Sequence, residues 1–381
     1  MVARNDILCC FAFVGCDIIR QLRTIQICLF DDTAVDNVGL ECTVACVVVL
    51  DEEFHGNLDC SDTLDVREHR QTYDSATVVS CSDSYISGTL LHTEEVATDE
   101  TILVDNASQD GSYEICLDYA EKRKAEGVSI TVLRQEKAGA CAARNKGLQV
   151  ARSEYVFFFD SDDEISKDFL IDIKTRIENA ACPPDLVYAP AMLCFANGRT
   201  KVRDYRATDC VADQVITAML CTQSMVMKRK WLMECGGWDE NLPRWNDWEL
   251  GVRLLSHKPS VEWLENKAYH RIHLHPESIT GKTFSADHTH LLKAIMKAKQ
   301  TIDESRLSMA EKQKSRNALA GKLLLLSAQL CRENHPAPAK TYSAQALSWV
   351  STPLRRWAFA LFHRASAFGI PGVWRWYAAF M

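Results

Sequence analysis

The 381-residue chain lacks several features that define common protein classes. It has no uninterrupted apolar run of the roughly 20 residues that a membrane-spanning helix needs. It has no Gly-rich phosphate loop near its first predicted strands, which argues against a nucleotidyltransferase. Its 16 cysteines include no C-x-x-C pair, so zinc-finger spacing is absent. We interpret these cysteines as reduced thiols of a cytoplasmic protein, with disulfides as the less favoured alternative.

The charge is unevenly distributed along the sequence. Residues 1–75 carry 5 Lys and Arg against 14 Asp and Glu, whereas residues 305–381 carry 11 against 2. The part between them is acidic, and the whole chain has a net charge of −8. An acidic middle argues against nucleic acid as the main partner.

From residue 76 onward, short apolar runs alternate with amphipathic segments. The predicted strands are 77–80, 101–104, 129–133 and 155–159, and the predicted helices between them are 85–92, 113–126 and 140–151. Later short strands are expected at 186–189, 225–227 and 261–264. This alternation predicts an α/β fold with a doubly wound, mostly parallel sheet. The carboxyl ends of its strands then face one common crevice.

Three parts of the chain are distinguished on this basis. Residues 1–75 form an N-terminal extension with one convincing strand, 43–50, whose pairing partner is not evident. Residues 76–300 form the α/β domain, and residues 301–381 form a helical, basic and aromatic-rich C-terminal region. Within that region, residues 353–381 interleave aromatic residues with arginines, which is typical of a helix lying in a membrane interface. The alternative is a helical pair packed on the protein's own surface.

The apolar run 155–159 leads directly into Asp160, Asp162 and Asp163. A continuous β-branched and aromatic run is typical of a strand buried on both faces, so these carboxylates lie at the carboxyl end of a strand. Crowded carboxylates repel one another unless a positive group compensates. The pattern therefore indicates a candidate site for Mg²⁺ or Mn²⁺ holding phosphate oxygens. A solvated acidic turn that caps the next helix is the alternative.

Several motifs, spaced along the chain, together indicate one protein family, which none of them would indicate alone. In chain order they are DNASQD (105–110), AGACAARNKG (138–147), DSDD (160–163), and GGWDE (236–240) with NDWE (246–249). Together they resemble the inverting family 2 glycosyltransferases of the GT-A fold over roughly residues 76–280. The resemblance implies a half that binds a nucleotide-sugar, followed by a half that binds the acceptor.

The resemblance also implies roles for individual residues. Five residues would bind the nucleotide-sugar: Cys81, Asp105, Ser108, Arg144 and Asp160. Asp105 corresponds to the residue that contacts base or ribose, and Arg144 suits the diphosphate because a planar guanidinium matches phosphate geometry. The stretch 81–84 occupies the place of the uracil pocket but lacks the family's Tyr-Asn pair, which leaves the identity of the base open.

Asp160 and Asp162 match the family's Asp-x-Asp pair. By that match Asp162 contacts the divalent metal directly and Asp160 holds ribose or metal-bound water. His273 stands where the family often places a histidine that completes the metal shell, and neutral imidazole is a reasonable ligand for Mn²⁺. A structural histidine is the alternative.

Asp247 is the predicted catalytic base. It precedes an amphipathic helix, where the helix dipole and free N–H groups stabilise an ionised carboxylate. Such a carboxylate can accept the proton of an attacking hydroxyl group. The family's common Glu-Asp pair is Asn246-Asp247 here, so one carboxylate is missing. An N-terminal helix residue without a catalytic role is the alternative.

These features favour metal-assisted, inverting transfer of a sugar from a nucleotide donor, expected to be a UDP-sugar. The expected acceptor is a hydroxyl group of a carbohydrate or lipid-linked molecule in cell-envelope polysaccharide or glycolipid synthesis. The expected location is the cytoplasm, with residues 353–381 as a candidate contact to the inner face of the cell membrane. One alternative is a non-catalytic module that binds sugar-nucleotides or glycans. A phosphatase with an Asp nucleophile is disfavoured, because Asp163-Glu164 stands where those enzymes place Thr or Val.

Overall fold

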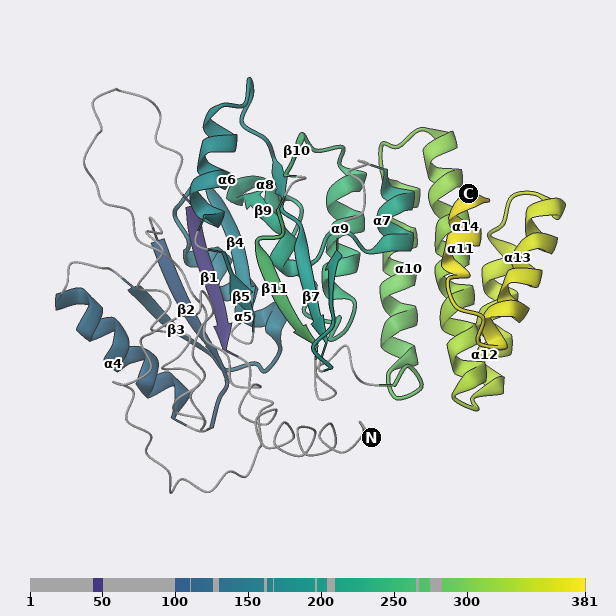
Figure 1. The fold of residues 1–381 in the computed structure, drawn as a ribbon, viewed down its shortest axis with the longest axis horizontal. Helices are drawn as coiled ribbons and strands as arrows, with labels where there is room; N and C mark the ends of the chain where they lie inside the picture. Colours follow the sequence, from purple (N-terminus) through teal and green to yellow (C-terminus); the bar gives the residue numbers. More distant parts are fainter. Residues whose placement is uncertain are drawn as a thin grey trace, which may run out of the picture.

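The computed structural model describes residues 44–50 (main chain only), 100–109, 111–125, 130–160, 163–166, 168–195, 197–203, 210–264, 267–274 and 283–380. In these residues, a seven-stranded sheet has the strand order β10-β6-β9-β4-β1-β2-β3. Its strands are β1 (Val44–Leu50), β2 (Glu100–Asn106), β3 (Ile130–Gln135), β4 (Tyr155–Asp160), β6 (Leu186–Tyr188), β9 (Met225–Lys228) and β10 (Val261–Trp263). All neighbouring pairs are parallel except the two that β9 makes with β4 and β6. The predicted α/β, mostly parallel sheet is confirmed (Figure 1).

Both faces of this sheet are covered, which explains the unbroken apolar sequence of β4. Val156 and Phe158 pack on one face together with α5 (Ala140–Val150). Tyr155, Phe157 and Phe159 pack on the other face together with α4 (Ser112–Ala125) and α6 (Phe169–Glu178). Successive side chains of a strand point to opposite faces, so a doubly covered strand needs apolar residues at every position.

The chain order gives the sheet a switch point. It runs from β1 to β2 to β3 on one side, and then returns to place β4 on the other side of β1. In open α/β sheets ligands bind outside the carboxyl ends of the strands at such a point.

Residues 44–50, expected to be a strand without an evident partner, form β1 between β2 and β4. The main sheet therefore includes a strand from residues 1–75, which the sequence analysis assigned to an N-terminal extension. The strand predicted at 77–80 and the helix predicted at 85–92 lie outside the described residues.

A second, four-stranded sheet lies beyond β4, and the sequence patterns did not indicate it. Its order is β5-β11-β7-β8, and its strands are β5 (Glu164–Ile165), β7 (Ala191–Phe195), β8 (Thr200–Arg203) and β11 (His270–Leu274). Short helices lie in the chain between β8 and β11: α7 (Val211–Thr217), the 3₁₀ helix η2 (Thr222–Ser224), α8 (Arg229–Glu234) and α9 (Asn246–Ser256). This sheet carries His273.

The C-terminal region is helical, as predicted. It consists of α10 (His288–Glu304), α11 (Met309–Arg332), α12 (Pro336–Ser348), α13 (Pro353–Ala367) and α14 (Trp374–Ala379). These helices stack on the side of the molecule away from α4 (Figure 1). Helix α11 packs against α7, and α10 packs against α9, so the helical region lies directly on the second half of the α/β fold. The predicted boundary at residue 300 falls inside α10.

Candidate active site

Two carboxylates flank the switch point. In the strand register Asp105 of β2 is opposite Leu50, and Asp160 of β4 is opposite Val49. Both therefore end strands beside the end of β1, about 10 Å apart across two strand spacings. Asp105 is fully buried, and its Oδ2 lies 3.6 Å from Nε of Arg134. Arg134 also donates to the carbonyl of Ser108 at 3.1 Å, so it ties the loop after β2 to β3.

The loop after β2 positions helix α5. The side-chain oxygen of Asn106 accepts a hydrogen bond of 2.9 Å from the N–H of Gly139, the residue before α5. Gly139 has a backbone φ of 135°, a value that residues other than glycine rarely adopt. This turn aims the start of α5 at the carboxyl edge of the sheet and brings Arg144, one turn further on, to Asp160.

Arg144 is the central cation of the site. Its side chain is buried, its Nη2 donates to Asp160 Oδ1 at 2.7 Å, and its guanidinium lies 4.6 Å from the ring centroid of Trp238. Burial lowers the pKa of Arg144, but the nearby carboxylates of Asp160 and Asp247, together with Cys141, raise it above its ordinary value. Arg144 thus lies within electrostatic range of both the strand-end carboxylate and the predicted base, although these are 87 positions apart in the sequence.

Gln223 is a site residue that the sequence patterns did not reveal. It is buried in η2, and its side-chain amide donates to Asp160 Oδ2 at 2.9 Å and to Asp163 Oδ2 at 2.5 Å. Arg144 and Gln223 therefore each bind a different oxygen of Asp160. No motif surrounds Gln223, so only its place in the fold marks it.

The second sheet brings His273 to the same edge. The main-chain N–H of His273 donates to Asp163 Oδ1 at 3.1 Å, and its ring Nε2 lies 3.0 Å from Oε1 of Glu164. A carboxylate on one ring nitrogen is the arrangement that orients a metal-binding histidine, whose other nitrogen then faces the ion. Asp163 and Glu164 thus hold His273, the imidazole ligand that the resemblance implies, at this edge.

The metal site is only partly within the described chain. Asp162, the expected direct ligand, and Cys81 lie outside the described residues. Among the residues that the structure does describe, no three His, Cys, Asp or Glu side chains are grouped closely enough to hold a metal ion. Asp160 and Asp163 flank Asp162 in the sequence, and His273 is bound to Asp163. Oxygen and imidazole donors together suit Mg²⁺ or Mn²⁺.

Asp247 lies in the first turn of α9. The preceding Trp245 has a left-handed conformation with φ of 58°, which turns the chain sharply into the helix. Oδ1 of Asp247 accepts the N–H of Trp248 at 2.7 Å, so a first-turn N–H without a helical partner holds this carboxylate. The carboxylate is half-buried. Its other oxygen has no hydrogen bond to the described residues that would compete with a substrate hydroxyl group.

The GGWDE segment joins α5 to the second half of the fold. Asn145 binds the main chain of Trp238 twice, donating to its carbonyl and accepting its N–H, both at 2.9 Å. Gly237 has φ of 61°, and a Cβ at this position would lie 2.8 Å from Oδ1 of Asn145. The turn therefore requires glycine. It fixes Trp238 beneath Arg144, where the indole is buried in the core.

Comparison with known proteins agrees with this geometry. Residues 84–236 match the model of the glycosyl transferase family 2. The chain is 41% identical over 71 residues to the cholesterol galactosyltransferase of Borreliella burgdorferi, which is 19% of each chain. It is 26% identical over 178 residues to the minor teichoic acid biosynthesis protein GgaB of Bacillus subtilis, which is 45% of this chain and 19% of GgaB. The matched segments thus span about a fifth of the length of these relatives.

Two solved structures share the fold over most of the chain. TarS of S. aureus (residues 1–349, with UDP-GlcNAc) has a TM-score of 0.55 at 17% identity, over 88% of this chain and 90% of TarS. The mannosyltransferase PcManGT of Pyrobaculum calidifontis (with GDP-Man and Mn²⁺) has a TM-score of 0.50 at 16% identity, over 98% and 94%. The predicted GT-A fold is confirmed by these likenesses.

Proposed function

We propose that the protein transfers a sugar from a nucleoside-diphosphate donor to a hydroxyl group of an acceptor, with inversion at the anomeric carbon. The match of residues 84–236 to the model of glycosyl transferase family 2 supports this proposal. The observation that carries the proposal is Arg144, whose guanidinium binds Asp160 and lies within electrostatic range of Asp247. A carboxylate at the donor edge and a carboxylate at a helix N-terminus then serve one reaction centre. A UDP-sugar is the proposed donor, and a carbohydrate or lipid-linked hydroxyl group is the proposed acceptor, in synthesis of a cell-envelope polysaccharide or glycolipid.

The residues have distinct tasks in this reaction. Asp247 accepts the proton of the acceptor hydroxyl group as its oxygen forms the new bond to the anomeric carbon. The bond from that carbon to the diphosphate breaks, and its electron pair goes to the diphosphate oxygen. Asp160, Asp162 and His273 would hold a divalent cation, which supplies positive charge for the departing diphosphate without a proton. Arg144 and Gln223 keep Asp160 in position throughout.

An Asp247→Asn variant tests the assignment of the base. It keeps the side-chain oxygen that accepts the N–H of Trp248 but no longer takes up a proton, so transfer should fall at least about 100-fold. Donor binding, measured calorimetrically with Mn²⁺ present, should stay within about twofold of wild type. A donor screen that detects the released nucleoside diphosphate measures the transfer.

Asp118→Asn is the matched control, because Asp118 is an exposed acid on α4. Full transfer by the Asp247→Asn variant would remove Asp247 from the mechanism. The missing carboxylate at Asn246 favours the competing idea of a non-catalytic binding module. Tight binding of UDP by the wild type, with no turnover of any donor, would support that module instead.

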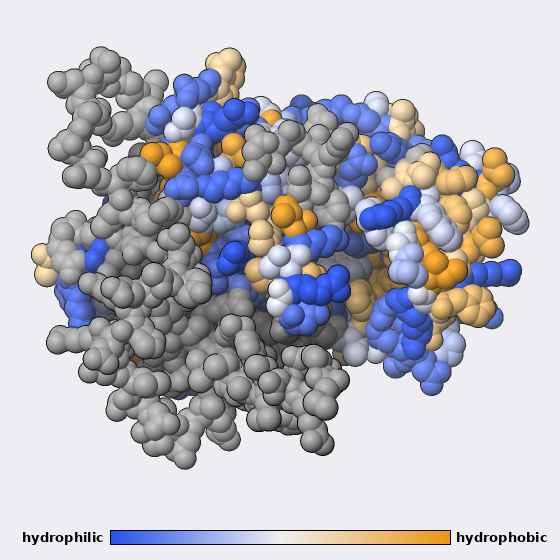
Figure 2. Space-filling model, viewed as in Figure 1, coloured by the Kyte–Doolittle hydropathy of each residue, from blue (hydrophilic) through white to orange (hydrophobic). Residues whose placement is uncertain are grey.

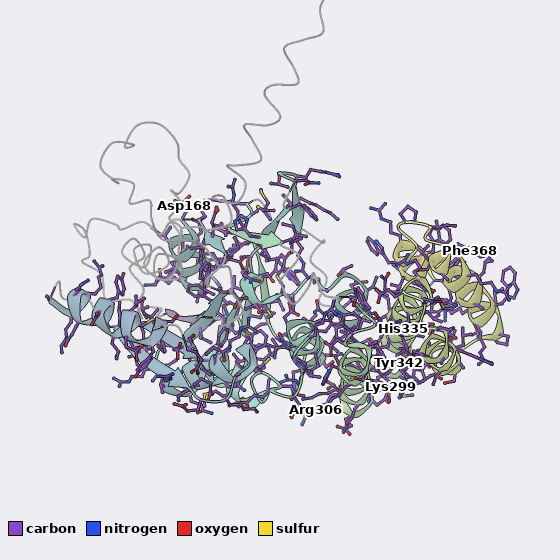
Figure 3. All side chains as sticks on the ribbon, turned by 90° about the horizontal axis from the view of Figure 1, so that it is seen from below. Asp168, Lys299, Arg306, His335, Tyr342 and Phe368 are labelled. Atoms are coloured by element: carbon purple, nitrogen blue, oxygen red, sulfur yellow. The ribbon has the colours of Figure 1, made fainter. Side chains whose placement is uncertain are left out.

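We also propose that α13 and α14 contact a membrane surface. Leu354, Trp357 and Leu361, spaced along one face of α13, are 72%, 67% and 48% exposed. The opposite face, with Phe359 and Phe362, is buried against the protein. Phe368 is 88% exposed and projects from the far end of the helical region (Figure 3). Apolar residues gather over this end of the molecule (Figure 2).

The charge of the same segment suits anionic lipid. After Glu333 the sequence contains no Asp or Glu, while Arg355, Arg356, Arg364 and Arg375 lie in α13 and α14. No helix in the described ranges has the length and apolar content to cross a bilayer. An apolar stripe bordered by arginines is instead suited to lying in the interface, with the arginines toward the headgroups.

Sedimentation with phosphatidylglycerol vesicles tests this surface in the full chain. Trp357→Glu should weaken binding about tenfold, because it places a carboxylate in the apolar stripe. Met309→Glu is the control, because Met309 is 73% exposed but lies at the start of α11. Equal vesicle binding by wild type and Trp357→Glu would show that this face is not the contact.

A further inference from the structure

Lys322 is a cation of the helical region that reaches the α/β half of the molecule. It lies on α11, and its Nζ is 4.5 Å from the ring centroid of Trp245 and 5.3 Å from that of Trp248. These two rings are themselves 5.6 Å apart and bracket Asp247 in the sequence. A lysine 75 positions downstream of Asp247 is therefore placed at the start of the helix that carries the proposed base.

Lys322 is half-buried, and a positive and a negative side chain influence its pKa. Burial and the nearby guanidinium of Arg203 lower the pKa of Lys322 to about 8, and the carboxylate of Asp247 offsets part of that effect. Lys322 forms no hydrogen bond or ion pair with any residue in the described ranges, and its ammonium group lies near the two indole rings. Arg144 differs, because Asp160 binds it directly.

The ammonium group of Lys322 lacks hydrogen-bond acceptors among the described residues. Indole faces attract a cation, but they replace only part of the hydration that burial removes. An anionic oxygen would supply the missing hydrogen bonds, and an ammonium group binds phosphate or carboxylate as a compact point charge. The half-buried ring of Trp245 lies beside it and offers an apolar surface for the carbon atoms of a sugar or polyol.

We propose that Lys322 binds an anionic group, phosphate or carboxylate, of the acceptor and so presents the acceptor's hydroxyl group to Asp247. This proposal rests on the proposed transferase function and specifies its acceptor as an anionic sugar or polyol. Arg203 adds to the positive potential of the subsite. The helical region then supplies one residue of the acceptor site.

A labelling experiment tests the subsite without relying on activity. Amine acylation of the full-length protein at pH 8, read by peptide mass spectrometry, reports the reactivity of Lys322, with exposed Lys340 as the internal control. Glycerol 3-phosphate or glycerate at tens of millimolar should slow labelling of Lys322 severalfold and leave Lys340 unchanged, whereas glycerol should not. Protection by glycerol 3-phosphate alone identifies phosphate as the group, and protection by glycerate alone identifies carboxylate. Equal labelling with and without both anions overturns the proposal.

Acceptor kinetics give the second test. In matched pairs of neutral and phosphorylated or carboxylated acceptors, wild type should prefer the anionic member. Lys322→Met should lower kcat/KM for the anionic member about 10- to 100-fold more than for the neutral one, whereas Lys322→Arg should keep most of the preference. A loss that is equal for both members would mean that Lys322 acts on Asp247 rather than on the acceptor, and would refute the proposal. Absence of any transfer or donor hydrolysis by wild type would instead refute the transferase function.

Discussion

Replacing Arg144 by methionine probes the contact that holds the two halves of the candidate site together. The substitution keeps the unbranched stem and removes the guanidinium. The variant loses the 2.7 Å charge-assisted hydrogen bond to Asp160, worth about 1.5–3 kcal/mol, and the stacking on Trp238, worth about 0.5–2 kcal/mol. Asp160 keeps its bond to Gln223 and its side chain is 26% exposed, so the remaining charge is partly solvated. We therefore expect the free energy of unfolding to fall by about 2–4 kcal/mol.

Urea denaturation followed by tryptophan fluorescence measures this loss as a lower midpoint at an unchanged slope. Arg152→Met is the matched control, because Arg152 is exposed just after α5, and it should change stability by no more than about 0.5 kcal/mol. Arg144→Lys should fall between the two, because lysine keeps the charge but cannot stack as a planar group. If Arg144→Met proves as stable as Arg152→Met, the ion pair does not hold the site together.

Two further experiments test the tight turn at Gly237 and the buried His270. Gly237→Ala should destabilise the fold by about 2–3 kcal/mol, because alanine is strained at φ of 61° and its Cβ would press on Asn145. Gly236→Ala, whose Cβ would meet nothing nearer than 3.7 Å, should cost about 1 kcal/mol less, and equal urea midpoints would contradict the steric argument. Burial lowers the pKa of His270 from 6.5 to about 3, so the unfolded chain takes up this proton first and stability is lost as pH falls from 6.5 toward 3. His270→Leu should reduce the difference in urea midpoint between pH 7 and pH 5, and an unchanged difference would exclude His270 as its source.

The strands of the main sheet could be predicted where the apolar pattern of the local sequence reflects burial of the strand. The run from Tyr155 to Phe159 is apolar at every position because both faces of β4 are covered, and this is visible in the sequence alone. Residues 44–50 are equally apolar and were expected to form a strand. Their central place between β2 and β4 was not evident, because strand pairing depends on segments far apart in the chain.

The second sheet escaped prediction for a different reason. Strand β5 has two residues, and the four residues of β8 are exposed or half-buried, so neither shows the apolar alternation that marks a strand. Gln223 was missed because a glutamine in a short 3₁₀ turn carries no motif. Its role arises only where the fold brings Asp160 and Asp163 together. The motifs contain Asp160, Arg144 and Asp247, but not Gln223, the side chain that links two of the carboxylates.

The helical region contacts the helix that carries Asp247, and α11 shows how. Lys322 on this helix faces Trp245, at the start of the helix that carries Asp247. The preceding residue, Gly321, packs so closely on Tyr377 of α14 that a Cβ would lie 3.1 Å from that side chain. One turn of α11 therefore contacts both the proposed acceptor subsite and the proposed membrane-facing helices. An acceptor drawn from a membrane surface would meet α13 and α14 on one side of α11 and Lys322 on the other. Changes in the packing of Gly321 should accordingly alter acceptor use before they alter donor binding.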